Sequence, residues 1–212
     1  MECNLKQLVG AGMCAVALLV FAMSDSLAAS PGACISDEEA GLLSLIDQYR
    51  LENQLPAIPW SKSLTTVAQW HVLDAVENGD DIFNNQCNRH SWSNLLPELW
   101  SGGCYDENHS NASMMWAKPS EITAGVYPWA GFEISGWGYF SVSDVLKGWQ
   151  NSVGHNNVIL NQAVWTSYPW KAMGVGVDLV NRYYYVWFST VSDPQGKVAL
   201  CSELINFNSS FE

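Results

Sequence analysis

The sequence predicts a mixed fold in which helices come first and a β-hairpin comes last. Apolar residues recur at helical spacing over residues 36–55 and 61–79, and again over residues 141–152. Residues 173–191 instead alternate with a period of two, with a turn at Asn181, which is typical of paired strands. Helices followed by strands indicate the α+β class, either with separate parts or as a layered α-β-α arrangement.

Local signals set the expected ends of the helices. Ser36 and Glu39 have the spacing of a capping box, so the first helix should begin there. Pro56 interrupts the periodic pattern and should follow its end. Gly79 is expected to end the second helix, and Ser141 is placed to cap the third.

Residues 80–130 form a long irregular segment between the helices, rich in Asn, Trp, Gly and Pro. A loop of this length in a compact domain is usually functional or held by covalent links. Its aromatic residues either form a small core for the loops, which we favour, or grip a ligand at the surface. The tryptophans in or beside it are Trp92, Trp100, Trp116, Trp129 and Trp137.

The first residues differ in character from the rest of the chain. Lys6 precedes an apolar run over residues 8–23, which is too short for a membrane span, and small residues follow at Ser26 and Ala28. We therefore expect residues 1–28 to be a cleaved signal peptide, with an N-terminal anchor helix as the alternative. Residues 29–212 would then be a single domain with its core over 36–190, either secreted or, in a bacterium, periplasmic.

Composition excludes some classes of partner. The 212 residues suffice for one domain with a full core, and 48% of them are hydrophobic. The net charge is −12, from 9 basic and 21 acidic residues, which repels phosphate backbones. Nucleic acid is therefore not an expected partner, and we expect a monomer without a stable membrane span.

Four cysteines remain after the expected cleavage, namely Cys34, Cys87, Cys104 and Cys201. An even number in an exported chain indicates two disulfides, for which three pairings exist. A bond between Cys87 and Cys104 would close a short loop. Cys34 and Cys201 would then join the two ends of the domain, and this is the pairing that we predict.

Five segments, in this order, resemble the CAP superfamily of cysteine-rich secretory proteins, venom allergens and plant pathogenesis-related proteins. The resemblance covers residues 36–190 and implies an α-β-α sandwich with a cleft. The segments are "LLSLIDQYRLENQLPAIPWSKSLTTVAQWH", "CNRHSWS", "GFEISGWG", "VLKGWQNSVGHNNVILN" and "MGVGVDL…YYYVWFS".

The resemblance also implies a set of site residues. The family's cleft carries two histidines and two glutamates, and its imidazoles can hold Zn²⁺ or a similar ion. The histidines fall on His90 and His155, and the first glutamate on Glu133. Ser152 stands where the second glutamate is usual, so a Zn²⁺ ion held by His90 and His155 should bind weakly. Glu133 is then expected to orient an imidazole instead of contacting the ion.

The remaining candidates have simpler interpretations. Gly154 is expected to let the backbone turn at a helix end, so that His155 points into the cleft. His71 lies on the apolar face of a predicted helix and is expected to be a satisfied core residue. His109, in a polar loop, is expected to be exposed. Glu98 is an alternative to Glu133 as the cleft glutamate.

We therefore predict a secreted binding protein, with no catalytic residues assigned, whose cleft is lined by His90, Glu133 and His155. The resemblance implies a lipid, a sterol or another small molecule as ligand, and an extracellular protein or glycan as partner, with a role in extracellular interaction or defence. Two alternatives are a metal-dependent hydrolase or protease, and a structural or adhesion module. The absence of a second carboxylate at Ser152 argues against the hydrolase.

Overall fold

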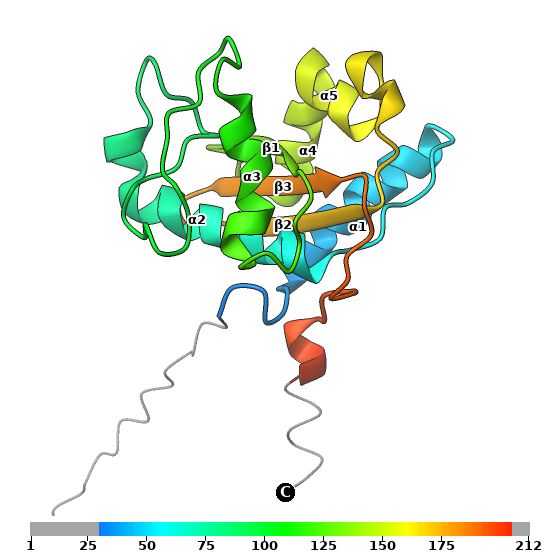
Figure 1. The fold of residues 1–212 in the computed structure, drawn as a ribbon. Helices are drawn as coiled ribbons and strands as arrows, with labels where there is room; N and C mark the ends of the chain where they lie inside the picture. The colour runs from blue at the N-terminus through cyan, green and yellow to red at the C-terminus, as the bar shows by residue number, and fades with distance from the viewer. Residues whose placement is uncertain (1–29, 205–212) are drawn as a thin grey trace, which may run out of the picture.

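A three-stranded antiparallel sheet forms the middle layer of the domain in a computed structural model, which describes residues 30–204. Strand β1 (Phe132–Trp137) is followed in the chain by β2 (Ala172–Asp178) and β3 (Tyr183–Ser189). The order in the sheet is β1-β3-β2, so β1 is an edge strand, drawn at the upper edge in Figure 1. The predicted hairpin is confirmed as β2 and β3. The expected signal peptide lies outside the described residues.

One face of the sheet is covered by an aliphatic layer. This layer contains α1 (Asp37–Glu52), α4 (Val142–Asn151), α5 (Val153–Ile159) and the short 3₁₀ helix η1 (Ala163–Ser167). We call it the aliphatic layer because branched side chains dominate its core, which includes Leu42, Leu43, Ile46, Val145, Leu146, Val158, Ile159 and, from the sheet, Ile134 and Val186.

The other face is covered by a layer rich in aromatic residues. Helix α2 (Lys62–Ile82) lies along β2 and β3, and α3 (Ala112–Ile122) packs beside α2. We call this the aromatic layer; its core includes Trp92, Trp100, Tyr105, Tyr127, Tyr185 and Trp187. Helices on both faces make the domain an α-β-α sandwich, which confirms the predicted fold class.

The predicted helix starts are confirmed where a serine was expected to cap. Ser36 accepts a hydrogen bond from the Glu39 N–H, and the Glu39 carboxylate accepts one from the Ser36 N–H. The Ser141 hydroxyl accepts from the Asp144 N–H at the start of α4. Helix α3, in contrast, has no side-chain cap hydrogen bond. Neither α3 nor β1 was predicted from the sequence.

The prediction that Gly79 ends the second helix is wrong, because α2 continues to Ile82. Gly79 has another role. A Cβ atom there would lie 2.7 Å from the Tyr183 hydroxyl oxygen and 3.1 Å from the Phe83 ring. This glycine therefore allows α2 to approach β3 closely.

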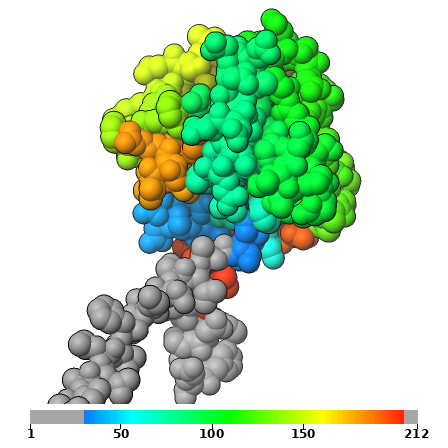
Figure 2. Space-filling model, turned by 90° about the vertical axis from the view of Figure 1, so that its left-hand side faces the viewer, coloured from blue at the N-terminus to red at the C-terminus, as the bar shows by residue number. Residues whose placement is uncertain are grey.

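Both predicted disulfides are formed, Cys34–Cys201 and Cys87–Cys104. The first joins positions near the two ends of the described chain. The second closes a loop in the irregular segment after α2. In Figure 2, α2 and the segment that follows it, coloured teal to green, cover the centre and right of the face that is shown. Among residues 30–204, no helix is both long and apolar enough to cross a membrane.

Candidate functional site

A cavity of about 650 Å³ opens beside β1. Its walls come from the irregular segment after α2, from α3, from β1 itself, and from α5 and η1. The lining residues include His90, Tyr105, His109, Met115, Trp116, Phe132, Glu133, Ile134, Ser135, Gly154, His155, Val158 and Trp165. The three residues that the sequence assigned to the cleft, His90, Glu133 and His155, thus all line one cavity.

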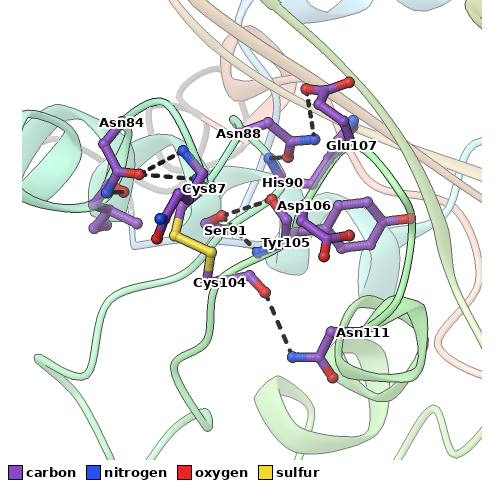
Figure 3. Close-up of a disulfide and its surroundings, with 12 residues drawn as sticks. Asn84, Cys87, Asn88, His90, Ser91, Cys104, Tyr105, Asp106, Glu107 and Asn111 are labelled. Carbon is purple, nitrogen blue, oxygen red and sulfur yellow. Dashed lines mark hydrogen bonds between the residues drawn. A yellow bond between two sulfur atoms is a disulfide. The ribbon is translucent and has the colours of Figure 1, made fainter.

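His90 is held in place by the short loop around the Cys87–Cys104 disulfide. The Asn88 N–H donates to the Tyr105 carbonyl at 2.8 Å, and the Asn88 side-chain oxygen accepts from the His90 N–H at 3.0 Å. Figure 3 shows His90 and Tyr105 close to the disulfide. The loop is therefore fixed by covalent and hydrogen bonds, although it lacks regular secondary structure.

Glu133 lies between two imidazoles. Its Oε1 atom is 2.6 Å from Nδ1 of His90, and its Oε2 atom is 2.6 Å from Nδ1 of His71. The side chains of Glu133 and His71 are fully buried. The His71 ring is stacked between Trp92 and Tyr185, with centroids 4.0 Å away on each side. His71 is thus a satisfied core residue, as predicted, and it also contacts the site.

The hydrogen bonds assign protons within this cluster. Nε2 of His71 lies 3.0 Å from the Ser91 carbonyl oxygen, which can only accept, so Nε2 carries a proton. A neutral His71 then has a lone pair at Nδ1, and Glu133 must donate to it as a carboxylic acid. The other oxygen of Glu133 accepts from Nδ1–H of His90. His90 is left with an unprotonated Nε2 atom, which has no partner among the described residues.

Burial explains why Glu133 can hold this proton. Desolvation raises the pKa of Glu133 to about 7, although its hydrogen bond and charge interaction with His90 act in the opposite direction. Desolvation lowers the pKa of His71 to about 3, against the opposing effect of its Ser91 hydrogen bond. A neutral imidazole beside a protonated carboxyl is therefore the favoured form below about pH 7.

His155 reaches the cavity from the aliphatic layer. Its half-buried ring has its centroid 6.4 Å from that of Trp149, and burial lowers its pKa. The chain turns at Ser152, which ends α4 and begins α5. The prediction that Gly154 makes this turn is wrong, because Gly154 lies inside α5.

The other candidates are now placed. Glu98 is exposed and does not line the cavity. His109 is exposed, as expected, yet it lines the cavity, with Nδ1 3.0 Å from the Tyr105 hydroxyl.

The five tryptophans in or beside the irregular segment divide between core packing and exposure at the surface. Trp92 and Trp100 are core residues, whereas Trp116, Trp129 and Trp137 are 41–52% exposed, and Trp116 lines the cavity.

Two functional candidates were missed by the sequence reasoning. His71 supports Glu133 from behind, but its place on an apolar helix face indicates only burial. Arg89 lines the cavity, and its guanidinium lies 4.2 Å from the Trp137 ring centroid and 5.6 Å from that of Phe83. Its Nε atom is buried without a partner in the described part of the chain. In the sequence, only the position of Arg89 next to His90 could have indicated that it lies at the site.

The donors in the cavity suit a weakly held metal ion at most. Nε2 of His90 is available, and the ring of His155 lines the same space. Both oxygens of Glu133 are already engaged by imidazoles. Within residues 30–204, no group of three or more His, Cys, Asp or Glu side chains is arranged to hold an ion. Two imidazoles are fewer ligands than Zn²⁺ usually takes from a protein.

Comparisons with known proteins agree with the sequence resemblance. The family model for the Cysteine-rich secretory protein family, CAP, matches residues 43–190. An extracellular SCP-domain protein from Bacillus anthracis str. Ames is 19% identical, with a TM-score of 0.47, over 72% of this chain and 40% of that one. A cysteine-rich secretory protein from Staphylococcus aureus subsp. aureus Mu50 is 14% identical, with a TM-score of 0.44, over 71% of this chain and 37% of that one. This chain thus matches less than half of either structure's length. No curated protein matches it.

Proposed function

We propose that this chain, which belongs to the Cysteine-rich secretory protein family, binds a small amphipathic ligand in the cavity beside β1. The observation that supports this proposal is the composition of the cavity wall. Its lining combines apolar and aromatic residues with eight polar or charged ones that converge from different elements. Its volume of about 650 Å³ is within the usual range for ligand sites.

The proposed ligand has an apolar body and a polar or anionic group. Met115, Trp116 and Val158 offer apolar contacts for the body, as a lipid or sterol would need. Arg89 offers donors and a positive charge for the polar end, and the unprotonated Nε2 atom of His90 offers an acceptor. Both oxygens of Glu133 are occupied, which favours ligand binding over a metal-dependent hydrolase that needs a free carboxylate.

A weakly bound Zn²⁺ ion is part of this proposal. His90 and His155 would hold it, and it would supply a positive charge for an anionic ligand group. Glu133 would orient His90 without contacting the ion. Calorimetric titration of Zn²⁺ should give weak binding that His155→Ala abolishes. Binding unchanged by His155→Ala would remove this ion from the proposal.

We further propose that the protein works as a monomer outside the cytosol, after loss of residues 1–28. Two disulfides support a location outside the cytosol, because such bonds persist mainly in oxidising compartments. The N-terminal sequence of the protein recovered from its native host would test the cleavage.

A cavity-filling variant tests the main proposal. A Cβ atom at Gly154 meets nothing within 4 Å, so Gly154→Trp should place an indole in the cavity without a backbone clash. Val153→Trp is the matched control, because Val153 precedes it in the same helix, is 79% exposed and does not line the cavity. A fluorescent fatty acid and a radiolabelled sterol serve as probes.

We expect wild type and Val153→Trp to bind at least one probe, and Gly154→Trp to bind it at least tenfold more weakly. If neither probe binds to wild type, or if Gly154→Trp binds as well as the control, the proposal is wrong.

A further inference from the structure

The cavity lies along the open edge of the sheet. Strand β1 pairs with β3 on one side only. Four consecutive residues of β1, 132–135, line the cavity. Because successive side chains of a strand point to opposite faces, a space that touches all four lies beside the strand's edge and not over one face. The cavity is therefore bordered by the backbone of β1.

The register shows which backbone groups face the cavity. The Gly138 N–H donates to the Arg182 carbonyl, so the backbone groups of Gly138 point toward β3. Every second residue back along β1, such as Ile134, likewise points its backbone N–H and C=O toward β3. Glu133 and Ser135 then point their backbone groups outward. Among residues 30–204, the N–H and C=O of Glu133 and the N–H of Ser135 have no hydrogen-bond partner.

Both ends of this open stretch are closed by the protein itself. The outward Gly131 N–H donates to the Trp116 carbonyl at 3.3 Å. The outward Ser135 carbonyl accepts from the Trp149 indole N–H at 2.8 Å. The unpaired groups between them form a donor, an acceptor and a second donor, spaced as in a strand. A lipid or sterol has no matching series of groups, whereas an extended peptide does.

The two walls of the cavity continue the two layers of the sandwich. Met115 and Trp116 of the aromatic layer form one wall, and Val158 and Trp165 on the aliphatic side form the other. A strand added beside β1 would place alternate side chains against each wall. The space thus has the surroundings that a further strand of this sheet would require.

We propose that the cavity receives an extended segment of a partner polypeptide, which adds to the edge of β1 as a fourth strand. The proposal extends the proposed function, since it rests on the same cavity being a binding site. The segment would exchange hydrogen bonds with the Glu133 backbone and accept one from the Ser135 N–H. With a net charge of −12, the protein attracts a basic segment over an acidic one. Its occupant is therefore a neutral or basic stretch with apolar side chains at alternate positions.

A proline substitution removes one edge donor without touching the existing sheet. Ser135→Pro deletes the outward N–H, and proline is tolerated on an edge strand where that group faces away from the neighbouring strand. Ser135→Ala is the matched control, because it removes the hydroxyl and keeps the N–H. The probe is a random dodecapeptide library displayed on phage, selected on wild type, with the best binder synthesised. We expect Ser135→Pro to bind this peptide about tenfold or more weakly than Ser135→Ala, while circular dichroism shows both folded.

Two further measurements do not depend on that variant. Methylating the peptide nitrogens one at a time should weaken binding at every second position, because only alternate N–H groups of an added strand face β1. Amide exchange should slow at Glu133 and Ser135 on peptide binding and stay unchanged at Ile134. Failure of the library to yield a binder, a methylation pattern without period two, or no protection of Glu133 and Ser135 overturns the proposal.

The two proposals can fail separately. Gly154→Trp should weaken both the peptide and the lipid or sterol probe, whereas Ser135→Pro, compared with its control Ser135→Ala, should weaken the peptide far more than either probe. A lipid or sterol that binds while no peptide does would leave the proposed function standing and refute strand addition. Peptide binding with the period-two pattern, but without binding of either probe, would support strand addition and refute the small ligand. A selected peptide matching this chain itself would identify a second copy as the occupant and refute a separate partner.

Discussion

The two layers that enclose the sheet are built on different principles. In the aliphatic layer, α1 and α4 carry serine caps and regular spacing of branched residues, and only the short α5 lacks a side-chain cap among its α-helices. In the aromatic layer, α2 is capped by Ser61, but α3 lacks a side-chain cap, and long loops are held by a disulfide. Both layers bury charged or polar side chains, Glu39 and Arg50 in α1 on one side and His71, Asp74 and Lys118 on the other, but only those of the aromatic layer include a contact to Glu133 of the site.

The difference shows where a fold of this kind can host a site. Buried polar groups are costly unless they are hydrogen-bonded, and loops offer backbone carbonyls that regular helices do not. The Ser91 carbonyl accepts from His71, and the Ser101 carbonyl accepts from the Lys118 ammonium, which also contacts Glu121. The irregular layer therefore satisfies the polar groups that the site needs, and the regular layer supplies a fixed support.

The largest expected effect comes from the disulfides. Replacing Cys34 and Cys201 by Ser should lower the free energy of unfolding by about 5 kcal/mol, because the bond spans 167 residues of sequence. The same change at Cys87 and Cys104, which are 17 residues apart, should cost about 3 kcal/mol. Urea unfolding measures both.

Ligand binding should rank these two variants in the opposite order. The loop that positions His90 depends on the Cys87–Cys104 bond, so loss of this bond should weaken binding of the fluorescent fatty acid more. Equal weakening by both variants would show that the aromatic layer does not need its disulfide to hold the site.

The next effect tests the proton held by Glu133. Glu133→Ala leaves both Nδ1 atoms of His71 and His90 without partners, and should cost about 3 kcal/mol of unfolding free energy. Glu133→Gln has the shape of a protonated carboxyl. Its amide can donate to His71 and accept from His90, so it should cost less than about 1 kcal/mol. If Gln is as damaging as Ala, Glu133 is ionised and His71 carries the charge.

The pH dependence of stability should separate the layers further. Between pH 4.5 and 6.5 the unfolded chain holds a proton on His71, and the folded chain holds one on Glu133 instead. The folded and unfolded chains bind equal numbers of protons there, so this pair adds no slope. On acidification it loses stability only below pH 4.5, where the unfolded Glu133 also binds a proton; above pH 6.5 it loses stability as pH rises toward about 7, because only the folded chain still holds a proton. His155 has a lowered pKa in the fold, so its contribution is lost as pH falls below 6.5.

Unfolding free energies measured from pH 5 to 7 check this difference. The fall on acidification should be smaller in His155→Gln than in wild type. An unchanged slope in His155→Gln would contradict the assignment of this pH dependence to His155.

The smallest effect concerns the helix caps. Ser36→Ala should cost about 1 kcal/mol, because it removes a capping hydrogen bond from α1. Asn111→Ala, at the matching position of α3, should cost less than about 0.5 kcal/mol, since no side-chain cap bond is lost. Thermal unfolding with equal effects at both sites would show that the Ser36 cap stabilises α1 no more than Asn111 stabilises the uncapped start of α3.

The sequence predicted those elements whose signals are local. The capping box at Ser36, the cap at Ser141 and the alternation in β2 and β3 each depend on residues within a few positions of one another. Helix α3 escaped prediction because Pro119 lies inside it and no side chain caps it. Strand β1 escaped because a buried Glu133 interrupts its apolar pattern.

The candidate site was predictable only in part, since its contacts join distant positions. The assignment of His90, Glu133 and His155 came from the family resemblance, and all three line one cavity. His71 and Glu133 are 62 residues apart in sequence, so no local pattern indicates their contact. Which proton each residue holds depends on the Ser91 carbonyl and on burial, and neither is visible before the chain is folded.

The Cys34–Cys201 bond has a consequence for how the domain can be presented to its surroundings. It joins positions near both ends of the described chain, on the side of the domain away from α5, which helps to line the cavity (Figure 1). A surface or sensor-chip tether fixed at that end would leave the α5 side of the domain free. Because both ends meet at one covalent link, pulling on them would load the disulfide and leave the sheet edge unstressed.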